Sequence, residues 1–314
     1  MTLRFGTRGS VLARWQTNQC VNLLKEKNID SEVVVIETFG DRVPYQSIAN
    51  LGAQGVFTKE IQSALLRREI DVAVHSLKDL PTESVSGLVL SSVLQRGSYR
   101  DAFLSPKAAV IEELPKGSRI GTGSLRRKTQ IIHRFGDLFR IDEIRGNIET
   151  RLQKLEQGEY DAIILAEAGL VRLGFADRIC SFLEPPFFLP AVGQGAIGLE
   201  IRCDDHRTAE QIASLCDMET WAAVLAERAM LQKLQGGCLA PIAALGRVDG
   251  EKLTLQGRIL SLDGKTMFET TRSLPLAQDP NSLGIAVADV LIDMGAETIL
   301  EEIQQQRHQS SITE

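Results

Sequence analysis

The sequence predicts an α/β protein with two lobes and a smaller α+β domain at the end of the chain. Three observations lead to this prediction: strand-like and helical segments alternate over the first two-thirds, short connectors flank the middle third, and alternating strands replace the pattern after Pro241. Alternation of strands and helices is typical of βαβ units on a largely parallel sheet. The length of 314 residues agrees with several domains, since one domain usually holds about 100–150 residues.

The first lobe begins with a strand that leads into a helix at 10–27. Leu12, Trp15 and Leu23 fall on one side of that helix, so this side is expected to be buried. A segment at 39–56, with several glycines and polar residues, then interrupts the pattern. Such a segment is usually a functional lid or disordered. The other elements expected here are strands at 3–7, 32–38 and 71–74 and a helix at 58–68.

The second lobe repeats the alternation between two connectors, 94–100 and 189–195, which are expected to carry the chain out and back. After Pro241, alternating strands and a helix from about Asn281 indicate a separate α+β domain. The predicted domains are lobe 1 (1–96 with 196–216), lobe 2 (100–191) and domain 3 (218–314). The expected elements are strands at 101–104, 119–122, 138–141, 161–165, 242–247, 253–259 and 265–271, and helices at 124–135, 148–157 and 166–170.

Composition and charge narrow the classes of function. The chain is 43% hydrophobic and 24% charged, which is an ordinary globular composition. Its longest apolar runs are far shorter than the roughly 20 residues of a bilayer span, and no apolar signal segment follows Met1. A cytoplasmic protein without membrane contact is therefore expected. The net charge of −6 argues against a nucleic-acid partner, and a monomer that binds a small molecule is expected.

The cysteines are odd in number and scattered, which favours reduced thiols in a cytosol over a disulfide framework. Cys203 and His206 have a metal-like spacing, but no second pair accompanies them, so no metal site is expected. Cys20 and Cys216 lie in helical patterns and are interpreted as core residues. The five cysteines are Cys20, Cys180, Cys203, Cys216 and Cys238.

Two turns of similar sequence, Gly6-Thr7-Arg8-Gly9-Ser10 and Gly121-Thr122-Gly123-Ser124, each follow a strand and open a helix. In both turns a serine occupies the N-cap position. The free N–H groups and partial positive charge at a helix N-terminus attract anions. Two such turns in two lobes predict a shared anionic ligand in the cleft between them.

Arg126 and Arg127 lie in the first turn of the second of these helices, where a cation opposes the helix dipole by about 0.3–1 kcal/mol. They are either a solvated basic patch or a pair that binds ligand carboxylates, for which the planar guanidinium is suited. More arginines near strand ends and helix starts favour a ligand with several carboxylates, since the sequence lacks Walker and dinucleotide-binding fingerprints. These further arginines are Arg8, Arg145, Arg151 and Arg172.

The segment His75-Ser76-Leu77-Lys78-Asp79 follows the strand at 71–74. The C-terminal ends of parallel strands face the ligand crevice of an open α/β sheet. Asp79, next to Lys78, is therefore a candidate acid, base or cation stabiliser, or else a turn residue before the proline that follows. His75 is interpreted as a packed structural histidine.

Cys238 lies in the loop Gln235-Gly236-Gly237-Cys238-Leu239-Ala240-Pro241, which joins a helix to the first strand of the last domain. Two glycines make this loop thin and mobile. The thiol is a nucleophile, a covalent attachment point or an idle surface cysteine, and the residues alone leave these alternatives open.

Four of these segments together resemble the porphobilinogen deaminase (hydroxymethylbilane synthase) family, because they stand in the family's order and at its spacing. The resemblance runs from about Leu3 to the end of the chain and thins after Pro241. The segments that carry it are His75–Asp79, Gly121–Arg127, Arg145–Asn147 and Gly236–Cys238, with further close matches at Asp161–Ala166 and Leu189–Gly195.

The resemblance implies two lobes like those of periplasmic binding proteins, followed by a third domain. It implies a transferase that deaminates porphobilinogen, joins four units head to tail on a covalent dipyrromethane cofactor, and releases hydroxymethylbilane and ammonia in tetrapyrrole biosynthesis. Each pyrrole ring carries an acetate and a propionate, which would give the arginines their ligand.

The resemblance also implies roles for individual residues. Asp79 would be the catalytic aspartate, which helps to expel ammonia and stabilises the resulting azafulvene cation. Cys238 would carry the dipyrromethane. The other cofactor-binding positions would be Lys78, Asp79, Thr122, Ser124, Arg126, Arg127, Arg145 and Gly146, and the substrate-binding positions Arg8, Ser10, Arg151, Arg172 and Gln194.

Several positions depart from the family pattern. Phe39 and Gln54 stand where arginine or another polar residue and lysine are common, so they remove positive charge from the expected lid and from its grip on the growing chain. Gly123 and Ala243 replace a frequent serine and a frequent glycine.

The main alternative function is a non-catalytic two-lobed receptor for an anionic small molecule, which the fold alone allows. A transcriptional effector domain is a weaker alternative, because it would need a helix-turn-helix segment and the sequence shows no pattern for one.

Overall fold

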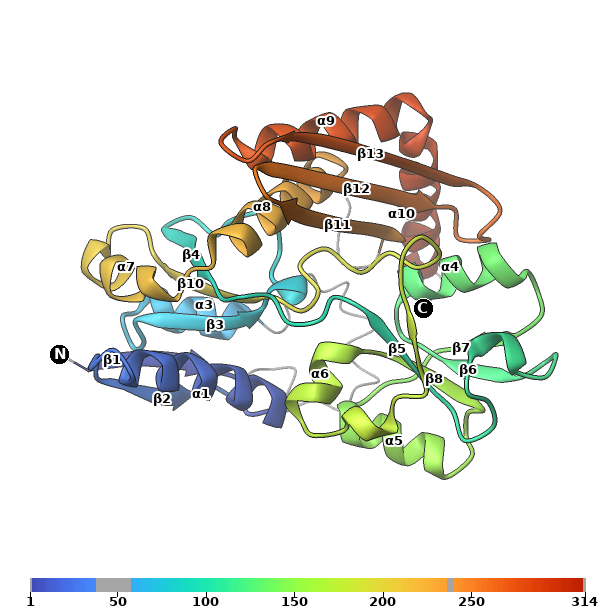
Figure 1. Cartoon of the computed structure of the whole chain (residues 1–314), viewed down its shortest axis with the longest axis horizontal. Coiled ribbons are helices and arrows are strands. Elements are labelled where there is room, and N and C mark those ends of the chain that lie inside the picture. The colour runs from blue at the N-terminus through green and yellow to red at the C-terminus, as the bar shows by residue number, and fades with distance from the viewer. Residues whose placement is uncertain (1, 38–57, 236–239, 313–314) are drawn as a thin grey trace.

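Two α/β lobes lie side by side, and a third sheet packs above them (Figure 1). This arrangement confirms the predicted fold class. Phe39, Gln54 and Cys238 lie outside the described residues. The computed structural model describes residues 2–37, 58–235 and 240–312, with side chains as far as residue 305.

The sheet of lobe 1 contains five strands in the order β2-β1-β3-β10-β4. β1, β2 and β3 are parallel, and β10 is antiparallel to both of its neighbours, so β10 alone runs against the other four strands of a largely parallel sheet. Val72 and Val74 face a core with α1, and Ala73 faces a core with α3, because successive strand residues point to opposite faces. The elements are β1 (Leu3–Thr7), α1 (Val11–Lys25), β2 (Ser31–Val35), α3 (Lys59–Leu66), β3 (Val72–Ser76), β4 (Leu88–Val93), β10 (Ile197–Arg202) and α7 (His206–Ile212).

The sheet of lobe 2 follows the same plan in the order β7-β6-β8-β5-β9. β6, β7 and β8 are parallel, and β5 is antiparallel to both of its neighbours. In each lobe the antiparallel fourth strand is the one that the chain enters from a connector. The elements are β5 (Asp101–Leu104), β6 (Arg119–Gly121), α4 (Leu125–Phe135), β7 (Arg140–Asp142), α5 (Ile148–Glu156), β8 (Ala162–Ala166), α6 (Glu167–Arg172) and β9 (Ser181–Leu183).

Some local predictions need correction. Trp15 is 37% exposed, and α1 buries instead the side that holds Gln16, Cys20 and Leu24. The buried side is partly polar because the amide of Gln16 donates to Ser76 Oγ at 2.8 Å across the sheet. His75 lies within β3, Arg172 ends α6 instead of following it, and Cys216 is half-buried in a loop, because each strand or helix ends later or earlier than its sequence pattern suggests.

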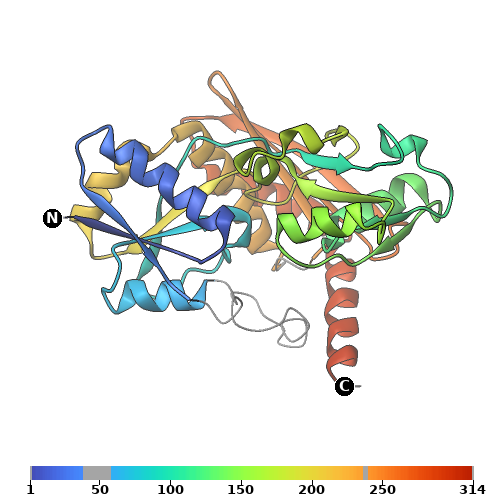
Figure 2. The ribbon, with the colours of Figure 1, turned by 90° about the horizontal axis from the view of Figure 1, so that it is seen from below.

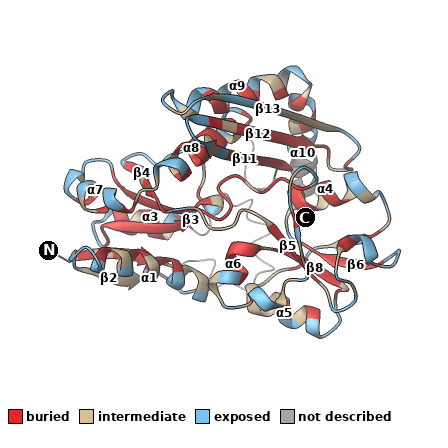
Figure 3. Ribbon diagram, in the orientation of Figure 1, coloured by how far each residue is buried: buried red, intermediate tan, exposed pale blue. Residues whose placement is uncertain are grey.

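Domain 3 is an antiparallel three-stranded sheet whose strands confirm the predicted pattern. α8 and α9 cover one face around Leu255, Val287 and Leu291, and the buried residues of this sheet lie on β11 and β12 (Figure 3). Figure 2 shows α10 extending away from the body of the molecule. The elements are α8 (Met218–Lys233), β11 (Ile242–Asp249), β12 (Lys252–Leu260), β13 (Met267–Pro275), α9 (Pro280–Asp293) and α10 (Ala296–Ile312).

Polar contacts hold the three parts together. The two connectors between the lobes touch where Gly97 N donates to Gly195 O at 3.2 Å. Arg258 of β12 donates to Gln130 Oε1 at 2.8 Å and to Pro186 O at 2.7 Å, which fixes domain 3 on lobe 2. Among the described helices, none is both long and apolar enough to cross a membrane.

Candidate active site

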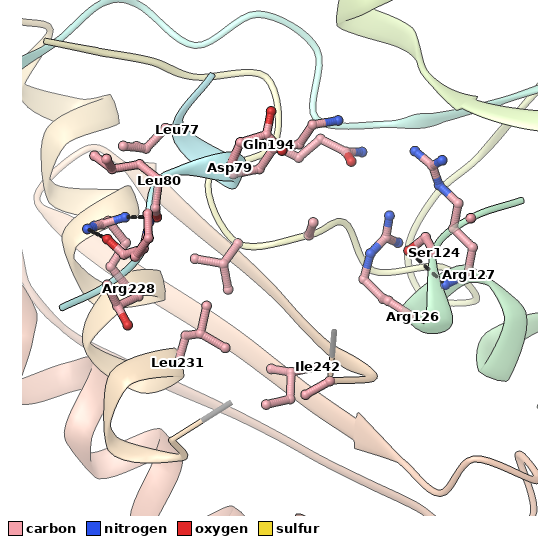
Figure 4. A pocket seen from close by; sticks show the side chains of 17 residues that line it. Leu77, Asp79, Leu80, Ser124, Arg126, Arg127, Gln194, Arg228, Leu231 and Ile242 are labelled. Atoms are coloured by element: carbon pink, nitrogen blue, oxygen red, sulfur yellow. Dashed lines mark hydrogen bonds between the residues drawn. The ribbon is translucent and has the colours of Figure 1, made fainter. Parts of the chain in front are cut away.

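Two adjoining cavities lie between the lobes, and Lys78, Asp79 and Arg127 line both. The first cavity, of about 200 Å³, also meets α8 and β11 of domain 3, and Figure 4 shows its lining. The second, of about 310 Å³, extends toward the helix N-termini of α1 and α5. Charged residues on the first are Lys78, Asp79, Arg126, Arg127 and Arg228, and those on the second include Arg8, Glu149, Arg151 and Arg172.

Lys78 and Asp79 reach the cavities because β3 ends in a tight turn. Leu77 begins a 3-10 turn over Leu77–Asp79; it is buried, and its N–H donates to Ala196 O at 3.0 Å. Asp79 is exposed and Lys78 half-buried. Burial lowers the pKa of Lys78 below its usual value, while the negative charge of Asp79 opposes that shift. The turn therefore presents an acid and a partly desolvated amine side by side.

Arg126 and Arg127 converge on Asp101 of β5. Arg126 Nη1 lies 2.7 Å from Asp101 Oδ2, and Arg127 Nη2 lies 2.8 Å from Asp101 Oδ1. The two arginines are 3% and 6% exposed, so the alternative of a solvated basic patch is wrong. Burial alone would raise the pKa of Asp101, but the charges of the two arginines outweigh it and hold the pKa well below its usual range.

The charge balance at this point favours an anionic ligand. Asp101 offsets one of the two arginine charges, which leaves a surplus of positive charge beside Lys78. Arg126 Nε is buried and has no hydrogen-bond partner among the described residues. A buried donor without a partner is costly, and a ligand carboxylate would satisfy it.

The predicted serine cap, and an asparagine cap, are present at the two helix starts of the second cavity. Ser10 accepts a hydrogen bond from Ala13 N, and Asn147 accepts one from Thr150 N. Ser124 caps α4 in the same way, so the predicted resemblance between the two lobes is confirmed locally. Arg151 lines this cavity and its Nε donates to Gly146 O at 2.8 Å. These helix ends and arginines form a second place where anions would be stabilised.

Arg172 connects the second cavity to the connectors between the lobes. Its Nη2 donates to Gly195 O at 2.6 Å, and its guanidinium lies 5.7 Å from the ring of Trp15. Burial lowers the pKa of Arg172. Its position thus depends on how the lobes are set relative to each other.

Two other predicted residues, Thr122 and Arg145, do not line either cavity, and Gln194 lines the first but is engaged behind it. Thr122 is buried and its Oγ1 accepts from Ser124 N at 3.3 Å. Arg145 pairs with Glu143 at 2.6 Å. Gln194 is 1% exposed and borders the first cavity, but its amide donates to Asp101 Oδ1 at 2.9 Å. Thr122 therefore supports the turn that begins α4, and Gln194 supports Asp101 behind the two arginines.

Sequence reasoning missed two residues of this site. Asp101 opens a strand, and the turn pattern around Arg126 gives no signal of it. Arg228 sits in the helical pattern of α8, with no motif around it. Both act through contacts between segments far apart in the chain. Cys238 lies outside the described residues, so its predicted role stays a prediction.

Comparison with known proteins agrees with these features. Residues 3–210 match the family model described as porphobilinogen deaminase, dipyromethane cofactor binding domain, and residues 221–293 match that of the porphobilinogen deaminase C-terminal domain. A porphobilinogen deaminase of Trichlorobacter lovleyi is 48% identical over 305 residues, covering 96% of this chain and 97% of the relative. One of Geobacter metallireducens is 46% identical, covering 96% and 95%.

Solved structures that match part of this chain include two binding proteins. The methionine-binding protein MetQ matches 68% of this chain and 89% of its own, with a TM-score of 0.45 and 13% identity. A nutrient-binding protein from Burkholderia cenocepacia, bound to methionine, matches 74% and 96%, with a TM-score of 0.44 and 11% identity.

Proposed function

The chain belongs to the porphobilinogen deaminase family, and we propose that its two cavities serve one acid, Asp79, in the deamination and joining of porphobilinogen. It is a transferase of tetrapyrrole biosynthesis with a dipyrromethane cofactor. It joins four porphobilinogen units head to tail and releases hydroxymethylbilane and ammonia. The observation that carries the assignment of the site is that Lys78, Asp79 and Arg127 line both cationic cavities.

The first cavity fits the cofactor because its charge and its orphaned donor call for carboxylates. When bound, the dipyrromethane supplies the pyrrole carbon to which the first unit is joined. Lys78, Arg126 and Arg127, with the hydroxyl of Ser124, would hold its carboxylates by charge-assisted hydrogen bonds. Domain 3 borders this cavity through Ala240 and Ile242. We propose Cys238, which follows α8 in the sequence, as the attachment point.

The second cavity fits the incoming substrate. Arg8, Ser10 and Arg151 line it and would hold the acetate and propionate of porphobilinogen, with Arg172 at its connector end. Asp79 would give a proton to the leaving amine and then stabilise the positive charge left on the pyrrole ring. Thr122, Arg145, Gly146 and Gln194 would support these groups. Exposure of Asp79 suits contact with a substrate.

We further propose that the protein is a cytoplasmic monomer with the domain bounds 1–96 with 196–216, 100–191 and 218–314. Each of these units holds one of the three sheets. The four described cysteines are free thiols, and Cys180 and Cys203 are exposed, which suits a reducing compartment.

Substitution of Asp79 tests the proposed function. Asp79→Asn loses the transferable proton and the negative charge, so ammonia release from porphobilinogen should slow at least about a hundredfold. Asp79→Glu keeps the carboxylate and should retain more activity. Intact mass should show added pyrroles on the wild type and none on Cys238→Ala. Near-normal turnover by a folded Asp79→Asn, or an adduct on another cysteine, would contradict the assignment.

A further inference from the structure

Helix α8 of domain 3 grips the chain directly after Asp79. Arg228 Nη1 donates to Leu80 O at 2.9 Å, and Arg228 Nη2 donates to Pro81 O at 2.7 Å. Figure 4 shows this fork beside the first cavity. A planar guanidinium that binds two successive carbonyls fixes both their distance and their orientation.

Apolar contacts on the same side of α8 reinforce this grip. Val224 is fully buried and belongs to one core cluster with Leu77 and Leu80, against which Trp221 also packs. Trp221, Val224 and Arg228 recur at helical spacing of three and four, so they form one side of α8. The turn that carries Asp79 therefore rests on a helix of another domain.

The same helix leads toward the segment that carries the proposed attachment cysteine. α8 ends at Lys233, and Gly236-Gly237-Cys238 follows shortly after in the sequence. Glu227, next to Arg228, is buried and accepts from Gly246 N at 2.8 Å, so α8 is also fixed to β11. α8 therefore links the turn that carries Asp79 to the sheet of domain 3.

We propose that Arg228 is a positioning residue that sets Asp79 against the cofactor-bearing domain by holding the carbonyls of Leu80 and Pro81. The inference rests on the proposed role of Asp79. Arg228 also borders the first cavity, so direct binding of a ligand carboxylate is the competing role. The two roles differ in kinetics, because a ligand contact changes KM or cofactor loading, whereas misplacement of the acid changes kcat.

The test compares Arg228→Met, which keeps the apolar stem, with Arg228→Lys, which keeps the charge. Arg207→Met is the control, because Arg207 is an exposed arginine on α7 that lines neither cavity. Rates are normalised to the fraction of molecules that intact mass shows loaded. Since a shift of about 1 Å can cost about a hundredfold, kcat of Arg228→Met should fall about tenfold to a hundredfold, with KM changed less than about twofold.

Arg228→Lys should recover part of kcat, because one ammonium reaches one of the two carbonyls. In a double-mutant cycle, Arg228→Met should add little further loss in the Asp79→Asn background, whereas a general structural defect would multiply the two losses. A normal kcat in Arg228→Met, a rise in KM alone, or a folded chain without cofactor would overturn the inference. If Asp79→Asn itself turns over normally, the proposed function fails instead.

Discussion

Asp101 takes up part of the positive charge that Arg126 and Arg127 bring to the site. The sequence indicates the two arginines, because a helix start with adjacent cations is a local pattern. It gives no sign of Asp101, which reaches them from strand β5 of the same lobe. Lys78 and Asp79 are also predicted from a local pattern, their position after the strand at 71–74, whereas Arg228 depends on packing between domains. Local chemistry is thus predictable here, and its long-range partners are not.

Loss of Asp101 should destabilise the protein more than loss of a comparable surface acid. Asp101→Asn leaves two buried cations without their anion, which should lower the free energy of unfolding by about 3–5 kcal/mol. Arg134 lies on α4, as Arg126 and Arg127 do, and pairs with the exposed Glu112. Glu112→Gln removes this pair and should lower the free energy of unfolding by less than about 1 kcal/mol. Urea unfolding of both variants at neutral pH measures the difference, and equal losses would show that the Asp101 cluster is not a stabilising centre.

The pH dependence of that difference follows from the depressed pKa of Asp101. The stabilisation is fully present above the ordinary pKa of an aspartate, about 3.9, and is lost as the pH falls through the lower folded value. The gap between wild type and Asp101→Asn should therefore stay constant through the neutral range and close only in strong acid.

At the scale of elements, the strands at Leu3–Thr7 and Asp101–Leu104 have the predicted bounds, and the two predicted serine caps are in place. Caps and alternation depend on neighbouring residues, so the sequence predicts them well. β4, β9 and β10 are absent from the prediction, because pairing with strands far away in the sequence defines them. The predicted buried side of α1 is wrong because the sheet against which the helix packs determines which side is buried.

The connector glycine Gly195 offers a prediction at this scale. Its φ is +88°, and a Cβ there would lie 2.6 Å from Ser98 O and 2.7 Å from Gly97 O. In Gly195→Ala the strained backbone conformation should lower the free energy of unfolding by about 1–3 kcal/mol. The added Cβ should also push the two connectors apart, which adds to the loss. Gly174→Ala is the matched control, because its φ is +78° with nothing within 4 Å. Differential scanning calorimetry should show a larger loss for Gly195→Ala, and equal losses would mean that the connectors yield freely.

At the scale of the whole molecule, one carboxylate joins both connectors to domain 3. Glu227 is fully buried and receives Arg96 Nη1 at 2.6 Å, Gly193 N at 2.7 Å and Gly246 N at 2.8 Å. Three separate sheets with their own cores are thereby coupled through a single charged group. The arrangement of domains around the site depends on such buried polar contacts, which no local pattern announces.

Neutralising this group should uncouple the domains. Glu227→Gln offers one acceptor oxygen to donors that now share two, so it should lower the stability by about 3–5 kcal/mol. It should also split thermal unfolding into two transitions, because domain 3 keeps its own core. Glu219→Gln, an exposed change in the first turn of the same helix, should cost about 0.3–1 kcal/mol. A single, unshifted calorimetric transition in Glu227→Gln would refute this coupling.

The place of β10 in lobe 1 has a consequence for synthesis on the ribosome. β10 separates β3 from β4, yet it is translated after every strand of lobe 2. Until residue 202 has left the exit tunnel, β3 and β4 lack their common partner and keep open edges, which are prone to mispairing. Lobe 2 has all its strands by residue 183. The lobe that starts the nascent chain is therefore the second to be completed.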